Sequence, residues 1–122
     1  MSKTELDGHC HCGRVRWTCS TRPEHLTRCN CSLCRRTGAV WAHRDPADVT
    51  LDYDPDGVIR YAHGDKSLDT ISCAHCGNTT HWEARDKSIN RIALNTTMCD
   101  PEQVADLPVR LFDGADSWTY LD

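Results

Sequence analysis

Residues 29–36 place three thiols within six positions and end in two cations: Cys29-Asn30-Cys31-Ser32-Leu33-Cys34-Arg35-Arg36. Further thiol pairs lie on either side of this stretch, in Cys10-His11-Cys12-Gly13 and in Cys73-Ala74-His75-Cys76-Gly77. Closely spaced thiolates are typical zinc ligands in proteins. Seven cysteines in groups of two, three and two therefore predict two metal sites of different kinds, and we interpret the rest of the chain as their scaffold.

The two outer pairs predict a closed, structural zinc site. In each pair a glycine follows the second thiol, where it allows a turn with positive φ that aims backbone N–H groups at sulfur. Together the pairs supply four thiolates, which fill the tetrahedral coordination of zinc and leave no position for a substrate. We expect this zinc to stabilise the fold directly. The alternative is four ordinary buried thiols. The predicted ligands are Cys10, Cys12, Cys73 and Cys76.

The central group predicts a second zinc with an open position. Cys29, Cys31 and Cys34 offer three thiolates without an obvious fourth ligand, which is the pattern of a catalytic zinc. The alternative is that His43 or His81 closes the coordination. Three thiolates leave a zinc site with a net negative charge, which weakens its power to acidify water and favours binding a sulfur ligand. The pattern therefore points to thiol substrates rather than to hydrolysis.

Four residues near the central group are candidates for binding a substrate. Arg35 and Arg36 could clamp a carboxylate through paired hydrogen bonds, or they could merely offset the anionic cluster. Trp41 and Trp82 are candidates for the wall of a pocket, with core packing as the alternative.

The candidate catalytic residues are one cysteine and two histidines. Cys31 is included because the activity we expect requires the open site of which it is a ligand. His43 and His81 are the candidates for proton transfer by residue type. The alternative for each histidine is a packed or surface side chain.

Composition limits the class of protein. A chain of 122 residues without a linker or low-complexity run suggests one domain over residues 1–122, and a content of 39% hydrophobic residues with a single Phe suggests a modest core. The formal charge of -4 argues against a nucleic-acid partner. No apolar run indicates a signal peptide or a membrane span. Nine cysteines, an odd number, then favour a reducing cytoplasm over a secreted disulfide framework. Nothing in the sequence indicates an oligomeric state.

The pattern of residues predicts a mostly β fold with several short strands and one brief helix. Residues 13–19 alternate between buried and exposed types, as a half-buried strand does. Residues 49–53 and 58–63 read as a hairpin around Asp54-Pro55-Asp56-Gly57. Residues 101–107 read as the helix, with Asp100 as N-cap. Residues 35–38 read as one helical turn ended by glycine. Other predicted strands cover residues 39–43, 68–72, 79–84, 89–96, 109–112 and 118–121.

Three strings in this sequence resemble, in order and spacing, the glutathione-dependent formaldehyde-activating enzyme family, which also includes centromere protein V. The strings are Gly8-His9-Cys10-His11-Cys12-Gly13-Arg14-Val15, Cys29-Asn30-Cys31-Ser32-Leu33-Cys34-Arg35-Arg36-Thr37-Gly38-Ala39 and Cys73-Ala74-His75-Cys76-Gly77. The resemblance implies coiled β-sheets around a structural zinc, a second zinc on the three central cysteines, and carbon–sulfur lyase or glutathione-adduct chemistry. It leaves the substrate open.

Two functions of different classes follow. One is a zinc-dependent carbon–sulfur lyase acting on a glutathione or other small-thiol adduct of the S-hydroxymethyl type, with two zinc ions per chain. The other is a non-catalytic zinc-binding scaffold or metallochaperone, in which the central site is closed or empty and small thiols do not perturb it.

Overall fold

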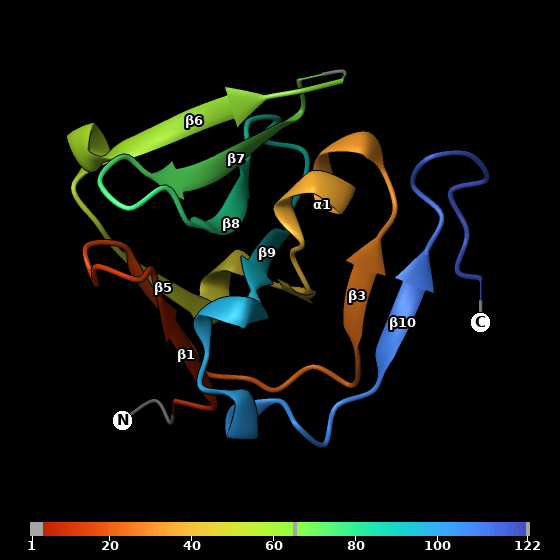
Figure 1. Cartoon of the computed structure of the whole chain (residues 1–122), viewed down its shortest axis with the longest axis horizontal. Helices are drawn as coiled ribbons and strands as arrows, with labels where there is room; N and C mark the ends of the chain where they lie inside the picture. The colour runs from red at the N-terminus through yellow and green to blue at the C-terminus, as the bar shows by residue number, and fades with distance from the viewer. Residues whose placement is uncertain (1–3, 65, 122) are drawn as a thin grey trace.

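The structure, a computed structural model, describes residues 4–64 and 66–121. Within them the chain forms ten strands in two sheets, one short α-helix and four single 3-10 turns, which confirms the mostly β prediction (Figure 1). The strands are β1 (Leu6–His9), β2 (Arg16–Cys19), β3 (Leu26–Cys29), β4 (Trp41–Arg44), β5 (Val49–Asp52), β6 (Val58–Ala62), β7 (Leu68–Cys73), β8 (Thr79–Ala84), β9 (Ile92–Asn95) and β10 (Val109–Phe112), and the helix is α1 (Ser32–Thr37).

The smaller sheet has the strand order β1-β2-β5, with antiparallel pairs throughout. The predicted alternation along residues 13–19 is confirmed, because Val15, Trp17 and Cys19 are each only 1% exposed while Arg16 and Thr18 face solvent. Burial of every second side chain leaves one face of this sheet apolar, and this face must pack against another layer.

The larger sheet has the order β10-β3-β4-β9-β8-β7-β6. Its pairs are antiparallel except for β10, which runs parallel to β3 although the two strands are about eighty residues apart in sequence. This pairing brings the C-terminal part of the chain beside the central cysteine stretch, which directly follows β3 (Figure 1).

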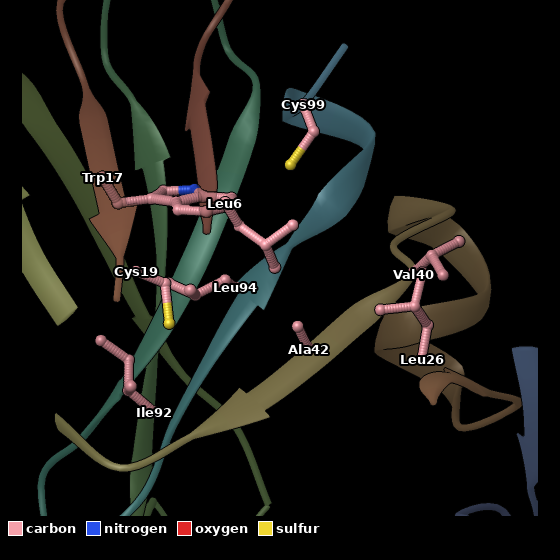
Figure 2. Packing of buried hydrophobic residues seen from close by; sticks show 9 residues of the cluster. All are labelled: Leu6, Trp17, Cys19, Leu26, Val40, Ala42, Ile92, Leu94 and Cys99. Carbon is pink, nitrogen blue, oxygen red and sulfur yellow. The ribbon is translucent and has the colours of Figure 1, made fainter. Parts of the chain in front are cut away.

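The core lies between the smaller sheet and the middle of the larger one. Trp17 and Cys19 from β2 meet Ala42 from β4 and Leu94 from β9, as Figure 2 shows. Successive residues of a strand point to opposite faces, so Trp41 and His43 of β4 lie on the other face of the larger sheet. There Trp41 packs in a second small cluster with Ala39, Ala93, Cys34 and Trp82.

The predicted hairpin around residues 54–57 is wrong, since β5 and β6 belong to different sheets. The turn itself forms, with the side chain of Asp54 accepting a hydrogen bond from the backbone N–H of Asp56. The two strands have other partners: β5 continues beside β2, where Leu51 lies opposite Trp17, and β6 pairs with β7. Turn chemistry fixes a change of direction but not the partner of the next strand.

The predicted helix over residues 101–107 is also wrong. Only Pro101–Gln103 form a 3-10 turn, and Asp100 makes no side-chain capping bond. Without this cap, so short a segment gains little from hydrogen bonding to offset nucleation, whereas the six residues of α1 are capped by Cys31. The α-helix is instead α1, which includes most of the predicted turn over residues 35–38 and ends at Gly38 with φ 70°.

Strands β1 and β3 were not predicted, and β9 is shorter than expected. Residues 118–121 form only an isolated bridge, between Tyr120 and Phe112, rather than a strand. All nine cysteines are free. Cys19 packs in the core as expected of a small apolar side chain, and Cys99 is buried in the same cluster. No helix in the part of the chain that the structure describes is long and apolar enough to cross a membrane.

Candidate metal centres and active site

The four outer cysteines converge although 61 positions separate Cys12 from Cys73. Their sulfur atoms all lie within 4.8 Å of one another, and Cys10 and Cys73 are fully buried. The Cys12 Sγ atom is 3.6 Å from the Sγ of both Cys10 and Cys73. Four sulfurs at this spacing can surround one tetrahedral metal ion.

The two halves of this four-thiol cluster are built alike. Cys10 donates its backbone N–H to the carbonyl of Val15, and Cys73 donates to the carbonyl of Asn78, each over 2.9 Å. In both halves the glycine after the second thiol has φ 82°. The Val15 N–H also points at Sγ of Cys10, at 3.3 Å. These are the turns that the sequence predicted, with N–H groups directed at sulfur.

A side chain connects the two halves. The backbone N–H of His11 donates to Oδ1 of Asn78 over 2.7 Å. Burial raises the pKa of Cys10 to about 11. The pKa of Cys12 falls to about 6, chiefly because the backbone N–H of Arg14 donates to its sulfur. A site with both a buried thiol and a thiolate-stabilising donor set is suited to a cation, which removes the cost of burying the charges.

The three central cysteines form a second cluster at the junction of β3 and α1. Cys29 ends β3, Cys31 is the N-cap of α1, and Cys34 lies in its first turn. Their sulfurs lie within 4.8 Å of one another. Backbone N–H groups again face sulfur: Cys31 donates to Cys29 over 3.4 Å, and Cys34 donates to Cys31 over 3.3 Å.

Burial and hydrogen bonding shift the pKa values of the three thiols in different directions. Burial raises the pKa of Cys34 and of Cys29. Burial also acts on Cys31, but hydrogen bonds, above all from the backbone N–H of Cys34, outweigh it and lower the pKa of Cys31. Within the described residues, the metal-ligating group contains these three cysteines and no histidine.

A pocket of about 500 Å³ opens beside the three-thiol cluster. Cys29 and Cys34 form part of its lining. Arg28 and Arg35 line another part. Apolar side chains complete the wall, among them Leu111, Phe112 and Leu121 from the C-terminal part of the chain. The four-thiol cluster contributes no residue to this pocket.

The loop after β10 closes against the three-thiol cluster. A Cβ atom added to Gly114 would lie 2.5 Å from Sγ of Cys29, so a side chain at this position would have to displace the sulfur. The loop is held there by Asn30, which donates to Asp113 over 3.0 Å and accepts from the backbone N–H of Ala115 over 3.0 Å. Sequence analysis missed Gly114 and Asn30 as site residues. The only signal was the glycine in the Asp113-Gly114 turn.

The model of the family described as "Glutathione-dependent formaldehyde-activating enzyme" matches residues 5–112, which include both clusters. The chain belongs to this family. A Halomonas elongata protein named "Putative glutathione-dependent formaldehyde-activating enzyme" is 52% identical over 60 residues, which are 48% of this chain and 34% of that protein. The match thus spans about a third of the length of that curated relative. A crystal structure of a Rhodobacter sphaeroides protein superposes with a TM-score of 0.69 at 26% identity, covering 85% of this chain and 99% of that one.

In this member of the family, the predicted substrate-binding residues lie in different places. Arg35 lines the pocket. Arg36 does not; its guanidinium donates to the carbonyl of Ser32 over 2.9 Å. Trp41 is 3% exposed and lies behind the cluster, where its indole Nε1–H donates to Sγ of Cys34 over 3.3 Å. Trp82 packs beside it in the same small cluster.

The two predicted catalytic histidines lie on opposite faces of the larger sheet. His43 pairs across β4 and β9 with Ala93 and contacts Trp82 edge-on, on the face that carries the three-thiol cluster. Burial lowers the pKa of His43 to about 4, so its imidazole is uncharged near neutrality. His81 pairs with Leu94 and is fully buried on the core side.

His81 belongs to a separate polar network. Its Nε2 atom lies 2.8 Å from Oε2 of Glu83, which also accepts from the Tyr53 hydroxyl over 2.5 Å. Burial raises the pKa of Glu83, but the hydrogen bonds from His81 and Tyr53 outweigh it and hold the pKa at about 2. Arg60 completes the network by donating to Tyr53 over 2.8 Å. His81 therefore lies on the face of the larger sheet opposite to that of His43, hydrogen-bonded to Glu83.

Proposed function

We propose that the protein catalyses reversible carbon–sulfur bond formation between a small thiol such as glutathione and formaldehyde, giving an S-hydroxymethyl thiol. The family supports this class of chemistry. The observation that carries the proposal is the position of the pocket, which opens on the three-thiol cluster and not on the four-thiol cluster. A site that both presents sulfur ligands and admits a small molecule is the arrangement expected of a catalytic centre.

The residues present fit zinc at both clusters. Each set of sulfurs is mutually within 4.8 Å and is met by backbone N–H donors. We assign the structural ion to Cys10, Cys12, Cys73 and Cys76, and the catalytic ion to Cys29, Cys31 and Cys34. When bound, the second ion would supply Lewis acidity that keeps a substrate sulfur in its thiolate form.

The chain's own residues then orient and shield the reactants. In the forward step the thiolate sulfur attacks the carbonyl carbon, a C–S bond forms, and the carbonyl π pair becomes an alkoxide that takes up the proton that the thiol released. In reverse the hydroxyl loses its proton as the C–S bond breaks and formaldehyde leaves. Leu111 and Phe112 give the pocket an apolar wall that limits water at the reacting sulfur. We assign the binding of the anionic part of the substrate to Arg35, a proposal that its position in the pocket lining supports.

We place the protein in the cytoplasm. The proposal rests on the nine free cysteines, two groups of which would be lost as metal ligands if they were oxidised to disulfides. A reducing compartment keeps such thiols available.

The test is an exchange measurement, because thiols and formaldehyde also combine without an enzyme. Zinc-loaded protein is added to glutathione and ¹³C-formaldehyde at equilibrium, and exchange NMR measures interconversion between free aldehyde and adduct. The proposal predicts exchange that rises in proportion to protein concentration and returns to the uncatalysed rate with Cys31→Ser. Exchange that does not respond to the wild-type protein would contradict it.

The same sample tests the alternative of a non-catalytic zinc scaffold. Glutathione is titrated into the zinc-loaded protein and heat is recorded by calorimetry. A scaffold with a closed central site predicts no thiol binding, whereas the enzyme predicts saturable binding that depends on the second zinc equivalent.

A further inference from the structure

We propose that Arg28 and Arg35 form a carboxylate-binding subsite, and that the thiol substrates of this protein therefore carry a carboxylate close to their sulfur. This inference rests on the proposed function and adds to it the substrate feature that the pocket recognises. Arg28 was not among the residues that sequence analysis selected.

The two arginines approach the pocket from different elements. Arg28 lies on β3 directly before Cys29 and pairs across to Leu111 of β10. Arg35 lies on α1 directly after Cys34. Both line the pocket whose wall includes those two cysteines. A ligand whose sulfur reaches the cluster therefore shares the pocket with two arginines, one from β3 and one from α1.

Neither guanidinium has a partner among the described residues. Most other arginines of this part of the chain do: Arg22 pairs with Asp106, Arg60 with Glu83, and Arg36 with the carbonyl of Ser32. Asp113, which follows the lining residue Phe112, is engaged by Asn30 and Ser117, and no acidic side chain of the described residues lines the pocket. Guanidinium groups left without an internal partner in a pocket are available to an external carboxylate.

Because the whole chain is negatively charged, binding of an anionic ligand requires cations at the site itself. With a formal charge of -4, the protein repels anions at long range. A three-thiolate zinc site adds a further negative charge next to the pocket. An anionic thiol would bind poorly unless local cations compensated, and Arg28 and Arg35 are the cations of the pocket lining.

The apolar part of the pocket lining limits the rest of the ligand. Leu111, Phe112 and Leu121 offer apolar contact without polar side-chain groups. The ligand class is therefore an aliphatic thiol acid, either a short one or the carboxylate-bearing part of a peptide thiol. The competing role for both arginines is to offset the charge of the thiolates, which would not depend on the ligand.

Calorimetry with a matched ligand pair separates these roles. Zinc-loaded protein is titrated with 3-mercaptopropionate and with 3-mercaptopropionamide, which differ only in the carboxylate. We expect the acid to bind about ten-fold more tightly than the amide, as for a charge-assisted contact. Arg28→Gln and Arg35→Gln should each reduce this preference several-fold while leaving amide binding unchanged. Arg91→Gln, an exposed arginine outside the pocket, is the control and should keep the full preference.

Two results would overturn the subsite. One is equal binding of acid and amide by the wild-type protein. The other is equal weakening of both ligands in the Arg28 and Arg35 variants together with a loss of zinc, which indicates the counter-charge role. The thiol pKa differs between the two ligands, but this difference affects the ratio of their affinities equally in the wild type and in the variants, so it cancels when these ratios are compared. Failure of the proposed function gives a different result, namely no binding of either thiol or binding without catalysed exchange.

Discussion

Trp41 donates its indole Nε1–H to Sγ of Cys34 over 3.3 Å, so that a buried residue is hydrogen-bonded to a sulfur of the three-thiol cluster. The ring is almost fully buried and packs with Ala39, Ala93 and Trp82. Its position is thus fixed by the larger sheet rather than by a ligand. The bond fixes the sulfur of Cys34 relative to the sheet and, when a metal is bound, would compensate part of the charge on this partly buried thiolate.

Replacing Trp41 by Phe should weaken metal binding at the three-thiol cluster without unfolding the protein. Phenylalanine keeps most of the packing but loses the donor, a loss of about 1 kcal/mol or about five-fold in zinc affinity. Competition with a chromogenic chelator measures the affinity of the more weakly bound of the two zinc ions. Trp82→Phe, in the same packing cluster, is the matched control and should leave that affinity unchanged. Equal zinc affinity in Trp41→Phe and the wild type would show that the bond contributes nothing.

Gly114→Ala should abolish the three-thiol site and spare the four-thiol site. The added methyl group would lie 2.5 Å from Sγ of Cys29, in the space next to the sulfur. Metal analysis should find one zinc per chain instead of two, with near-native circular dichroism. Gly57→Ala is the control, because its methyl group would meet Asp54 at an ordinary 3.6 Å. Retention of two zinc ions in Gly114→Ala would contradict the proposed closeness of this loop to the metal.

The cysteine groups could be predicted from sequence because the ligands within each group are only two or three positions apart. Cys31 and Cys34 are three positions apart, and one helical turn is enough to bring their sulfurs together. The convergence of Cys10 with Cys73 could only be inferred from the chemistry of four thiolates. The alternation along residues 13–19 was informative because one face of β2 is buried and the other is in water.

The residues that sequence analysis missed depend on long-range pairing. Nothing in residues 24–29 alternates, since both Leu26 and Thr27 are buried, so β3 gave no periodic signal. Its parallel pairing with β10 brings Leu111 opposite Arg28 and places Gly114 against Cys29. The hairpin and the helix were predicted from turn and capping residues, but β5 and β6 pair with other strands, and Asp100 makes no capping bond.

Cys73→Ser should unfold the protein, whereas Cys31→Ser should not. Cys73 is a fully buried member of the four-thiol cluster, which joins the smaller sheet to β7. A structural zinc contributes about 10–16 kcal/mol of apparent binding free energy, comparable to or larger than the total stability of about 5–15 kcal/mol for a domain. Thermal unfolding followed by circular dichroism distinguishes the two variants. A cooperative transition near the wild-type temperature in Cys73→Ser would exclude a structural metal at this cluster.

Acid should destabilise the protein partly through His43. Burial lowers its folded-state pKa to about 4, below the value of 6.5 expected in the unfolded chain. The stabilising contribution of the neutral ring is therefore complete above pH 6.5 and is lost as pH falls toward 4, because the unfolded state binds the proton first. At pH 5 the loss is about 2 kcal/mol. Urea denaturation gives the unfolding free energy at pH 7.5 and at pH 5. The decrease between the two pH values should be about 2 kcal/mol larger in the wild type than in His43→Gln.

Loss of zinc in acid lowers the unfolding free energy of wild type and of His43→Gln alike, so its effect cancels in the comparison. His63→Gln is the control, since His63 is exposed and its replacement should leave the pH dependence of the wild type unchanged. The NMR titration of the His43 ring gives an independent value and should have its midpoint near 4. An identical change in unfolding free energy between the two pH values in wild type and His43→Gln would mean that the ring is solvated in the folded protein, and that Trp82 does not shield it as the edge-on contact indicates.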